Sequence, residues 1–256
     1  MNSRQSPALV LTVRSHSESD KIISLLSQDF GKFTAIAKGA HRSKKRFVNK
    51  LEPFTLLNIT CRPPKRGSLF FLEQAELLEA NLGLRNEYRL YTAAGFICEL
   101  IGLFSIEQNP EPKMFSLACS SLNLLSRKQC RADILVTFFL LHLLQICGYG
   151  PKLDACGHCG RNIDRTPGFL LSPAGGSLVC DACRPAAGNS PLYLSCQSIK
   201  FLLAGQAMTM QRLTTLRMSR QNTREALTAL TSYSRHILQQ DIHSDKVIMT
   251  MLTSPD

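Results

Sequence analysis

The sequence predicts an α+β multidomain protein: an N-terminal β-barrel, then an α-helical domain with an inserted four-cysteine ribbon. Three observations predict this organisation. Short β-branched and aromatic runs fill roughly the first 80 residues, the apolar spacing becomes helical from Asn86, and two Cys-x2-Cys pairs interrupt the helical pattern. A chain of 256 residues, 44% of them hydrophobic, is long enough to divide into two or three units.

The first part of the chain holds five runs of strand length. Gly31 and Gly39 bound the third run, and a turn with two prolines and a glycine separates the last two. The second run fits a strand or a helix, and its neighbours favour a strand. Five strands in about seventy residues predict a small closed barrel of the OB-fold type, in which the face of strands 2 and 3 commonly binds oligonucleotides. The runs are 8–13, 21–27, 32–38, 54–61 and 68–77.

Helical spacing follows, with Pro110 and Pro112 at the start of the second helix. The third helix is apolar on nearly every side, as in a central core helix, and Gly148–Pro151 ends it. The expected helices are 88–103, 114–125, 132–147, 196–207 and 223–240. The expected domains are an OB-fold nucleic-acid-binding domain at 1–80, a helical domain at 81–150 and 191–256, and a zinc ribbon at 151–190.

Four cysteines have the spacing of a metal site: Cys156, Cys159, Cys180 and Cys183. Two thiolate pairs on tight turns can close a tetrahedron around one Zn²⁺. The alternatives are disulfides or simple burial, which suits the other six cysteines better because those lie in apolar stretches. Four sulfur ligands leave no position for water, so the sequence predicts a structural zinc ion. His158, between two of the cysteines, is expected to be exposed.

The formal charge of +11 favours a polyanionic partner. The excess is N-terminal, and the segment 32–50 holds seven bases and no acid. A solvated charged face is the alternative interpretation. We expect phosphate contacts from Lys38, Arg42, Lys44, Lys45 and Arg46, with Lys65 and Arg66 as support.

Aromatic side chains near these bases could stack on nucleic-acid bases. Phe33 and Phe70 lie on predicted strands, so we expect them in the barrel core. Phe47 has charged neighbours and is the expected stacking residue.

Catalysis has little support in the sequence. It has no phosphate-binding loop, dinucleotide fingerprint, zinc-protease motif or nucleophile elbow, and its carboxylates are sparse. Two rival functions remain: an RNA-binding or translation-linked zinc-ribbon protein, and a zinc hydrolase or nuclease with an open metal position. The chain shows neither a secretory signal nor a run long enough to span a bilayer, so we expect a cytoplasmic protein.

The order of these parts resembles the RecO family of bacterial recombinational DNA repair proteins. The resemblance runs from about Val10 to Cys183, and the chain after Ser219 matches it weakly. It is carried by the two Cys-x2-Cys pairs and by short segments: Glu18–Lys21, Gly31-Lys32, Ala37–Ala40, Leu51–Phe54, Gln74–Leu77 and Gly148–Pro151.

The resemblance implies a mediator without turnover chemistry that binds single- and double-stranded DNA and anneals complementary strands. It further implies work with RecR to load RecA onto DNA coated by single-strand binding protein, in the cytoplasm at the nucleoid. Some members lack the cysteines, so the resemblance assigns zinc to stabilising the ribbon.

Overall fold

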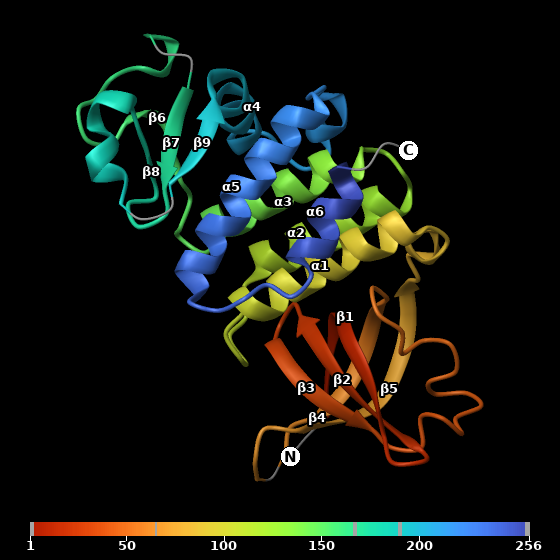
Figure 1. Ribbon diagram of the computed structural model, residues 1–256. Coiled ribbons are helices and arrows are strands. Elements are labelled where there is room, and N and C mark those ends of the chain that lie inside the picture. The colour runs from red at the N-terminus through yellow and green to blue at the C-terminus, as the bar shows by residue number, and fades with distance from the viewer. Residues whose placement is uncertain (1–2, 65, 166–167, 189–190, 254–256) are drawn as a thin grey trace.

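The computed structural model describes residues 3–64, 66–165, 168–188 and 191–253 (Figure 1). Three parts follow one another along the chain: a barrel, a bundle of helices, and a small sheet that interrupts the bundle in sequence and lies against its side. The barrel and the small sheet sit at opposite ends of the molecule.

Five strands close the barrel in the order β1-β2-β3-β5-β4. The long β1 pairs with β2 through its second half and with β4 through its first half, which closes the cylinder. Strands β3 and β5 run parallel, and the other pairs are antiparallel. The predicted OB-like barrel is confirmed, and the ambiguous second run is a strand. The strands are β1 (Arg4–His16), β2 (Asp20–Ser27), β3 (Gly31–Ala37), β4 (Leu56–Arg62) and β5 (Phe70–Glu79).

Alternation along β3 shows how the barrel fills its interior. Phe33, Ala35 and Ala37 point inward and are fully buried, while the residues between them face outward. The rings of Phe33 and Phe70 lie 4.6 Å apart between centroids. The prediction that these two rings belong to the core is confirmed.

Phe47 was expected to be an exposed stacking residue, and this prediction is wrong. Its side chain is only 3% exposed and belongs to the same barrel core as Phe33. The physical reason is that the connection between β3 and β4 folds back over the barrel, so an apolar side chain among charged neighbours can close the interior. The guanidinium of Arg46 then lies 5.0 Å from the centroid of the Phe47 ring.

The helical part is organised around α3, whose residues are buried on almost every side, as its composition predicts. Among the described residues, no helix is long and apolar enough to cross a membrane. A last helix, α6, was not expected. Glu99 on α1 accepts hydrogen bonds from the backbone N–H groups of His243 and Ser244 just before α6 begins. The helices are α1 (Tyr88–Phe104), α2 (Pro112–Ser126), α3 (Ala132–Ile146), α4 (Cys196–Gln206), α5 (Arg220–Leu238) and α6 (Asp245–Thr253).

The cysteine segment forms a sheet with the order β6-β8-β7-β9. The ribbon was expected to end at residue 190, which lies before β9. In the structure β9 pairs with β7 over four residues and is part of the same sheet. Leu194 of β9 is fully buried in the core shared with the helices, so this strand joins the ribbon to the bundle. The strands are β6 (Lys152–Cys156), β7 (Gly168–Ser172), β8 (Ser177–Val179) and β9 (Leu192–Ser195). Short 3-10 helices are η1 (Leu82–Arg85), η2 (Ile163–Arg165), η3 (Asp181–Ala187) and η4 (Arg212–Thr215).

The start of β3 joins the barrel to the helices. The Lys32 ammonium donates to the carbonyl of Gly102 near the end of α1 at 2.8 Å and pairs with Glu107 at 3.3 Å. The carbonyl of Lys32 accepts a hydrogen bond from the backbone N–H of Gln108 at 2.8 Å. Gly31 has a φ of +69°, and a Cβ added there would lie 2.4 Å from the carbonyl oxygen of Asn109. This contact therefore requires glycine for both its backbone conformation and its space.

Gly31→Ala should destabilise the protein more than Gly67→Ala. Both glycines have positive φ, but a Cβ at Gly67 would meet nothing within 4 Å. Each alanine costs about 1–2 kcal/mol for the left-handed backbone, and Gly31→Ala adds about 1–3 kcal/mol for overlap with the connection between α1 and α2. Urea unfolding of both variants measures the difference. Equal losses of stability would contradict the packing of Gly31 described above.

Candidate nucleic-acid interface and metal centre

The predicted phosphate-binding residues gather in the connection between β3 and β4, residues 38–55. Figure 1 shows this connection, in orange, extending outward from the barrel below the helices. Five side chains of the predicted set are exposed there: Lys38, Arg42, Lys44, Lys45 and Arg46. In the part of the chain that the structure describes, the side chains of Lys44 and Lys45 make no hydrogen bond or ion pair. Their charges are therefore available to an anionic partner.

Lys50, although part of the same basic run, holds this connection in place. Its ammonium donates to the carbonyls of Lys45, Arg46 and Ala75, at 3.3, 3.2 and 2.8 Å. The Arg46 guanidinium donates to the carbonyl of Lys38 at 3.3 Å, which links the two ends of the exposed stretch. Lys32 joins the barrel to the helices, as described above, so the basic run 32–50 contains both structural and exposed charges.

Asp20 fixes the beginning of the connection. Its carboxylate accepts hydrogen bonds from the backbone N–H of Gly39 and from the hydroxyl of Ser19, each at 2.8 Å. The hydrogen bond from Gly39, and then that from Ser19, lowers the pKa of Asp20 below its usual value. The carboxylate therefore stays charged and ties the turn between β1 and β2 to the basic connection.

The hairpin between β4 and β5 carries the second basic group. Arg66 is exposed in this hairpin, and Lys65 lies outside the described residues. Arg62, at the end of β4, pairs with Glu73 at 3.3 Å and lies 5.2 Å from the centroid of the Phe71 ring. The ammonium of Lys38 is 6.0 Å from the same centroid.

Phe71 is the aromatic residue that sequence analysis missed. It lies directly after the buried Phe70 on β5, so it points to the outer face of the barrel and is partly exposed. Strand alternation could have found it, because two adjacent aromatic residues on one strand must face opposite sides.

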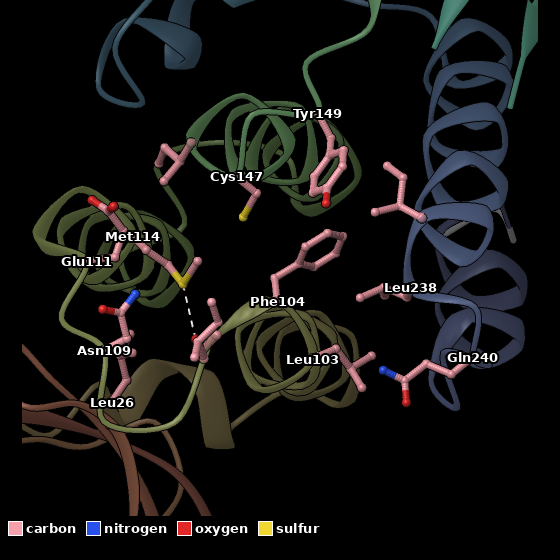
Figure 2. Close-up of a pocket in the computed structure, with 14 residues that line it drawn as sticks. Leu26, Leu103, Phe104, Asn109, Glu111, Met114, Cys147, Tyr149, Leu238 and Gln240 are labelled. Carbon is pink, nitrogen blue, oxygen red and sulfur yellow. Dashed lines mark hydrogen bonds between the residues drawn. The ribbon is translucent and has the colours of Figure 1, made fainter. Parts of the chain in front are cut away.

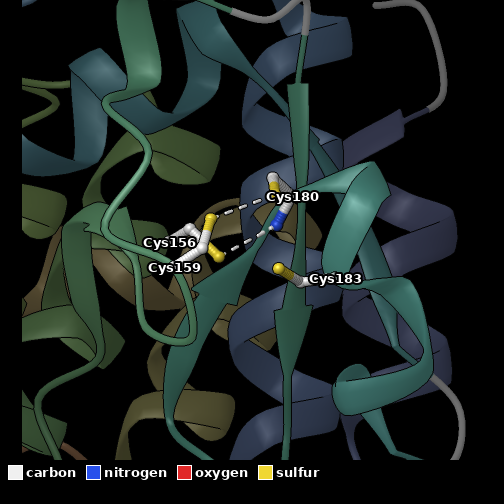
Figure 3. A group of neighbouring side chains, drawn as sticks. All are labelled: Cys156, Cys159, Cys180 and Cys183. Atoms are coloured by element: carbon white, nitrogen blue, oxygen red, sulfur yellow. Dashed lines mark hydrogen bonds between the residues drawn. The ribbon is translucent and has the colours of Figure 1, made fainter.

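The four predicted metal ligands come together in the small sheet (Figure 3). The four sulfur atoms lie within 4.8 Å of one another, and those of Cys159 and Cys180 are 3.6 Å apart. In a tetrahedral zinc–thiolate site the sulfur atoms are about 3.8 Å apart, given Zn–S bonds of about 2.3 Å. Cys156 ends β6, Cys180 immediately precedes η3, and Cys183 lies in its first turn. The donor set and its size therefore fit one tetrahedrally bound metal ion.

The surroundings of Cys156 favour its thiolate form. Burial disfavours the charge, but backbone N–H groups, including those of Cys159, Cys180 and His158, outweigh it and lower the pKa of Cys156 to about 6. Burial, and then hydrogen bonds to the other three thiols, raise the pKa of Cys183. A bound cation would supply the positive charge that four neighbouring thiolates need. His158 is exposed, as predicted.

A pocket of about 450 Å³ lies where the ends of several helices meet the barrel, and Figure 2 shows its lining. Most of the lining residues are apolar: Phe104 lies beside Tyr149 and Leu238, and Met114 lies on the opposite side, where its sulfur accepts a hydrogen bond from Ser105. The carboxylate of Glu111 accepts a hydrogen bond from the backbone N–H of Lys113 at the start of α2. Burial raises the pKa of Cys147 to about 11, so its thiol is protonated at neutral pH. The thiol in this pocket is therefore not an activated nucleophile.

Two family models match this chain in succession. The one described as "Recombination protein O N terminal" matches residues 1–81, and "Recombination protein O C terminal" matches residues 85–246. The chain is 33% identical to a DNA repair protein RecO from Syntrophus aciditrophicus, over 97% of each protein. It is 28% identical to the RecO of Syntrophobacter fumaroxidans, over 97% of this chain and 98% of the relative. It is 29% identical to the RecO of Caldanaerobacter subterraneus, over 95% and 96%. The chain therefore belongs to the RecO family of DNA repair proteins.

Proposed function

We propose that this protein is a DNA-binding mediator of recombinational repair that anneals complementary single strands. The observation that carries this proposal is the exposed basic stretch 38–46, held on a rigid barrel by Asp20 and Lys50. Lysine and arginine side chains that meet phosphates bind without reading sequence, and a protein that anneals any two complementary strands needs this kind of contact.

The proposed partners extend the function from DNA to protein. The protein would act with RecR to load RecA onto DNA covered by single-strand binding protein, in the cytoplasm at the nucleoid. The relatives support the repair role through their names, "DNA repair protein RecO". No turnover reaction is part of the proposal: the mediator binds, aligns and releases strands.

Replacing Lys44, Lys45 and Arg46 together by alanine should weaken binding to single- and double-stranded DNA. Each lost phosphate contact reduces the slope of log K against log salt by about 0.7 for single strands and about 0.9 for duplex, so the slope should fall by about 2 to 3. Anisotropy titrations of labelled DNA at several salt concentrations measure both quantities.

A charge-matched control replaces Arg212, Arg217 and Arg224 by alanine. These side chains are exposed on the helical part of the protein, in or near η4 and α5. The control removes the same formal charge but should leave most of the affinity and the slope unchanged. If both triple variants lost affinity equally, overall charge rather than the basic connection would account for binding.

We also propose that the four-cysteine site holds one structural Zn²⁺. Four sulfur donors leave no position for water, and a full set of ligands from the protein is typical of structural zinc. The site lies in the small sheet, at the opposite end of the molecule from the barrel (Figure 1). The metal would therefore stabilise the ribbon and the strand β9 that joins it to the helices, without touching DNA bound at the barrel.

Cys159→Ser should lower both the melting temperature and the zinc content, which is about one ion per chain in the wild type. Its DNA affinity should stay near that of the wild type. Cys147→Ser is the matched control, because Cys147 lies outside the cluster and should keep the zinc. Metal analysis, thermal unfolding and DNA titration of the same preparations measure the three effects. Wild-type protein that bound no zinc would contradict the metal assignment, and a large loss of DNA affinity in Cys159→Ser would contradict its separate role.

A further inference from the structure

An apolar row crosses the outer face of the barrel. Ile22 on β2 pairs with Ile36 on β3, and Ile36 pairs with Phe71 on β5. All three side chains face outward and are partly exposed. Outward positions of a barrel normally carry polar side chains, so three apolar residues in register across three strands form a distinct surface.

Cations stand at both ends of this row. Ile22 pairs with Arg14 on β1, and Phe71 pairs with Arg62 on β4, so the same row continues onto the two remaining strands. Arg14 and Arg62 are exposed. Adjacent strands are about 4.8 Å apart, so the five positions span about 19 Å along the curved surface of the barrel. An apolar strip of this length with positive ends fits a chain that carries both flat apolar groups and negative charges.

The ring of Phe71 is the aromatic member of the row. Lys38 and Arg62 both lie close to it, at 6.0 and 5.2 Å from its centroid. Lys38 is exposed and sits at the outer limit of a cation–π contact, so its ammonium can move from the ring to a phosphate at little cost. Arg62 is held by Glu73, which keeps a second cation beside the ring.

We propose that Phe71 is a stacking residue for the bases of single-stranded DNA, with Lys38 and Arg62 contacting the adjacent phosphates. The inference rests on the DNA-binding function proposed above and names the form of DNA that this face takes. Bases in a duplex stack on one another and present only their edges, whereas an unpaired strand offers base faces to the ring. The basic stretch 38–46 contacts the phosphate backbone of single-stranded and double-stranded DNA alike. The row through Phe71 favours single-stranded DNA, because it contacts unpaired bases.

Phe71→Trp provides a direct reporter, because the chain contains no tryptophan. An oligothymidylate of about 16 nucleotides, within the usual site sizes for a barrel of this kind, should quench the indole emission of Phe71→Trp. A duplex of the same length should bind with little quenching. Phe30→Trp is the control: Phe30 is also partly exposed, but it lies in the turn between β2 and β3, at the end of β3 away from Phe71, and its emission should not change.

Affinity gives a second measurement. Phe71→Leu should weaken binding of the oligothymidylate about five-fold or more, while Phe71→Tyr and Phe30→Leu should bind it like the wild type. Duplex affinity should be the same in all four proteins. Thermal unfolding of each variant checks that the barrel is folded, and the quenching of Phe71→Trp keeps the test valid if Phe71→Leu is unstable.

Two outcomes separate this inference from the function on which it rests. If anisotropy shows binding of the oligothymidylate but the emission of Phe71→Trp is unchanged and Phe71→Leu binds normally, Phe71 only packs against Ile36 and the inference is wrong. If wild-type protein binds neither form of DNA, the proposed function itself fails.

Discussion

The contact of Gly31 and Lys32 with the connection between α1 and α2 determines how the barrel is placed against the helices. It places one end of the barrel against the helices, where Gly31 leaves room for the carbonyl of Asn109 and Lys32 binds the carbonyl of Gly102. The basic side chains of the stretch 38–46 and of Arg66 then remain exposed, and the row through Phe71 remains partly exposed, within the described residues. A side chain at Gly31 would disturb the docking of the barrel without touching any residue of the proposed binding surface.

The basic side chains of this protein divide into those that hold the fold together and those that are exposed to solvent. Lys32 and Lys50 each make several hydrogen bonds to backbone carbonyls and so fix the fold around them. Lys44 and Lys45 contribute no such contact within the described residues. The same residue type has two roles within one short segment, because Lys32 is on a strand that meets the helices and Lys44 is on a connection that meets solvent. In the proposed function a phosphate backbone contacts the second kind of lysine, whose side chain gives up no contact within the described chain when it binds an anion.

Some features could be predicted from local pattern alone. The cysteine spacing predicted the four-cysteine cluster, the alternation in 32–38 predicted strand β3, and the continuous apolar run predicted the central helix α3. The burial of Phe47 could not be predicted, because it depends on the long connection 38–55 folding back onto a barrel assembled from distant strands. The row through Ile22, Ile36 and Phe71 depends on the register of three strands, of which β3 and β5 are far apart in the chain. Helix α6 could not be predicted either, because the backbone just before it is held by the carboxylate of Glu99, which lies far away in the sequence on α1.

Annealing of complementary single strands covered by single-strand binding protein tests the central claim most directly. The assay follows pairing of a labelled strand with its complement over time, with wild-type protein and with Lys44, Lys45 and Arg46 replaced together by alanine. The account predicts that wild-type protein accelerates pairing well above the rate with single-strand binding protein alone, and that the triple variant loses most of this acceleration. Pairing at the same rate with and without the wild-type protein would contradict the account.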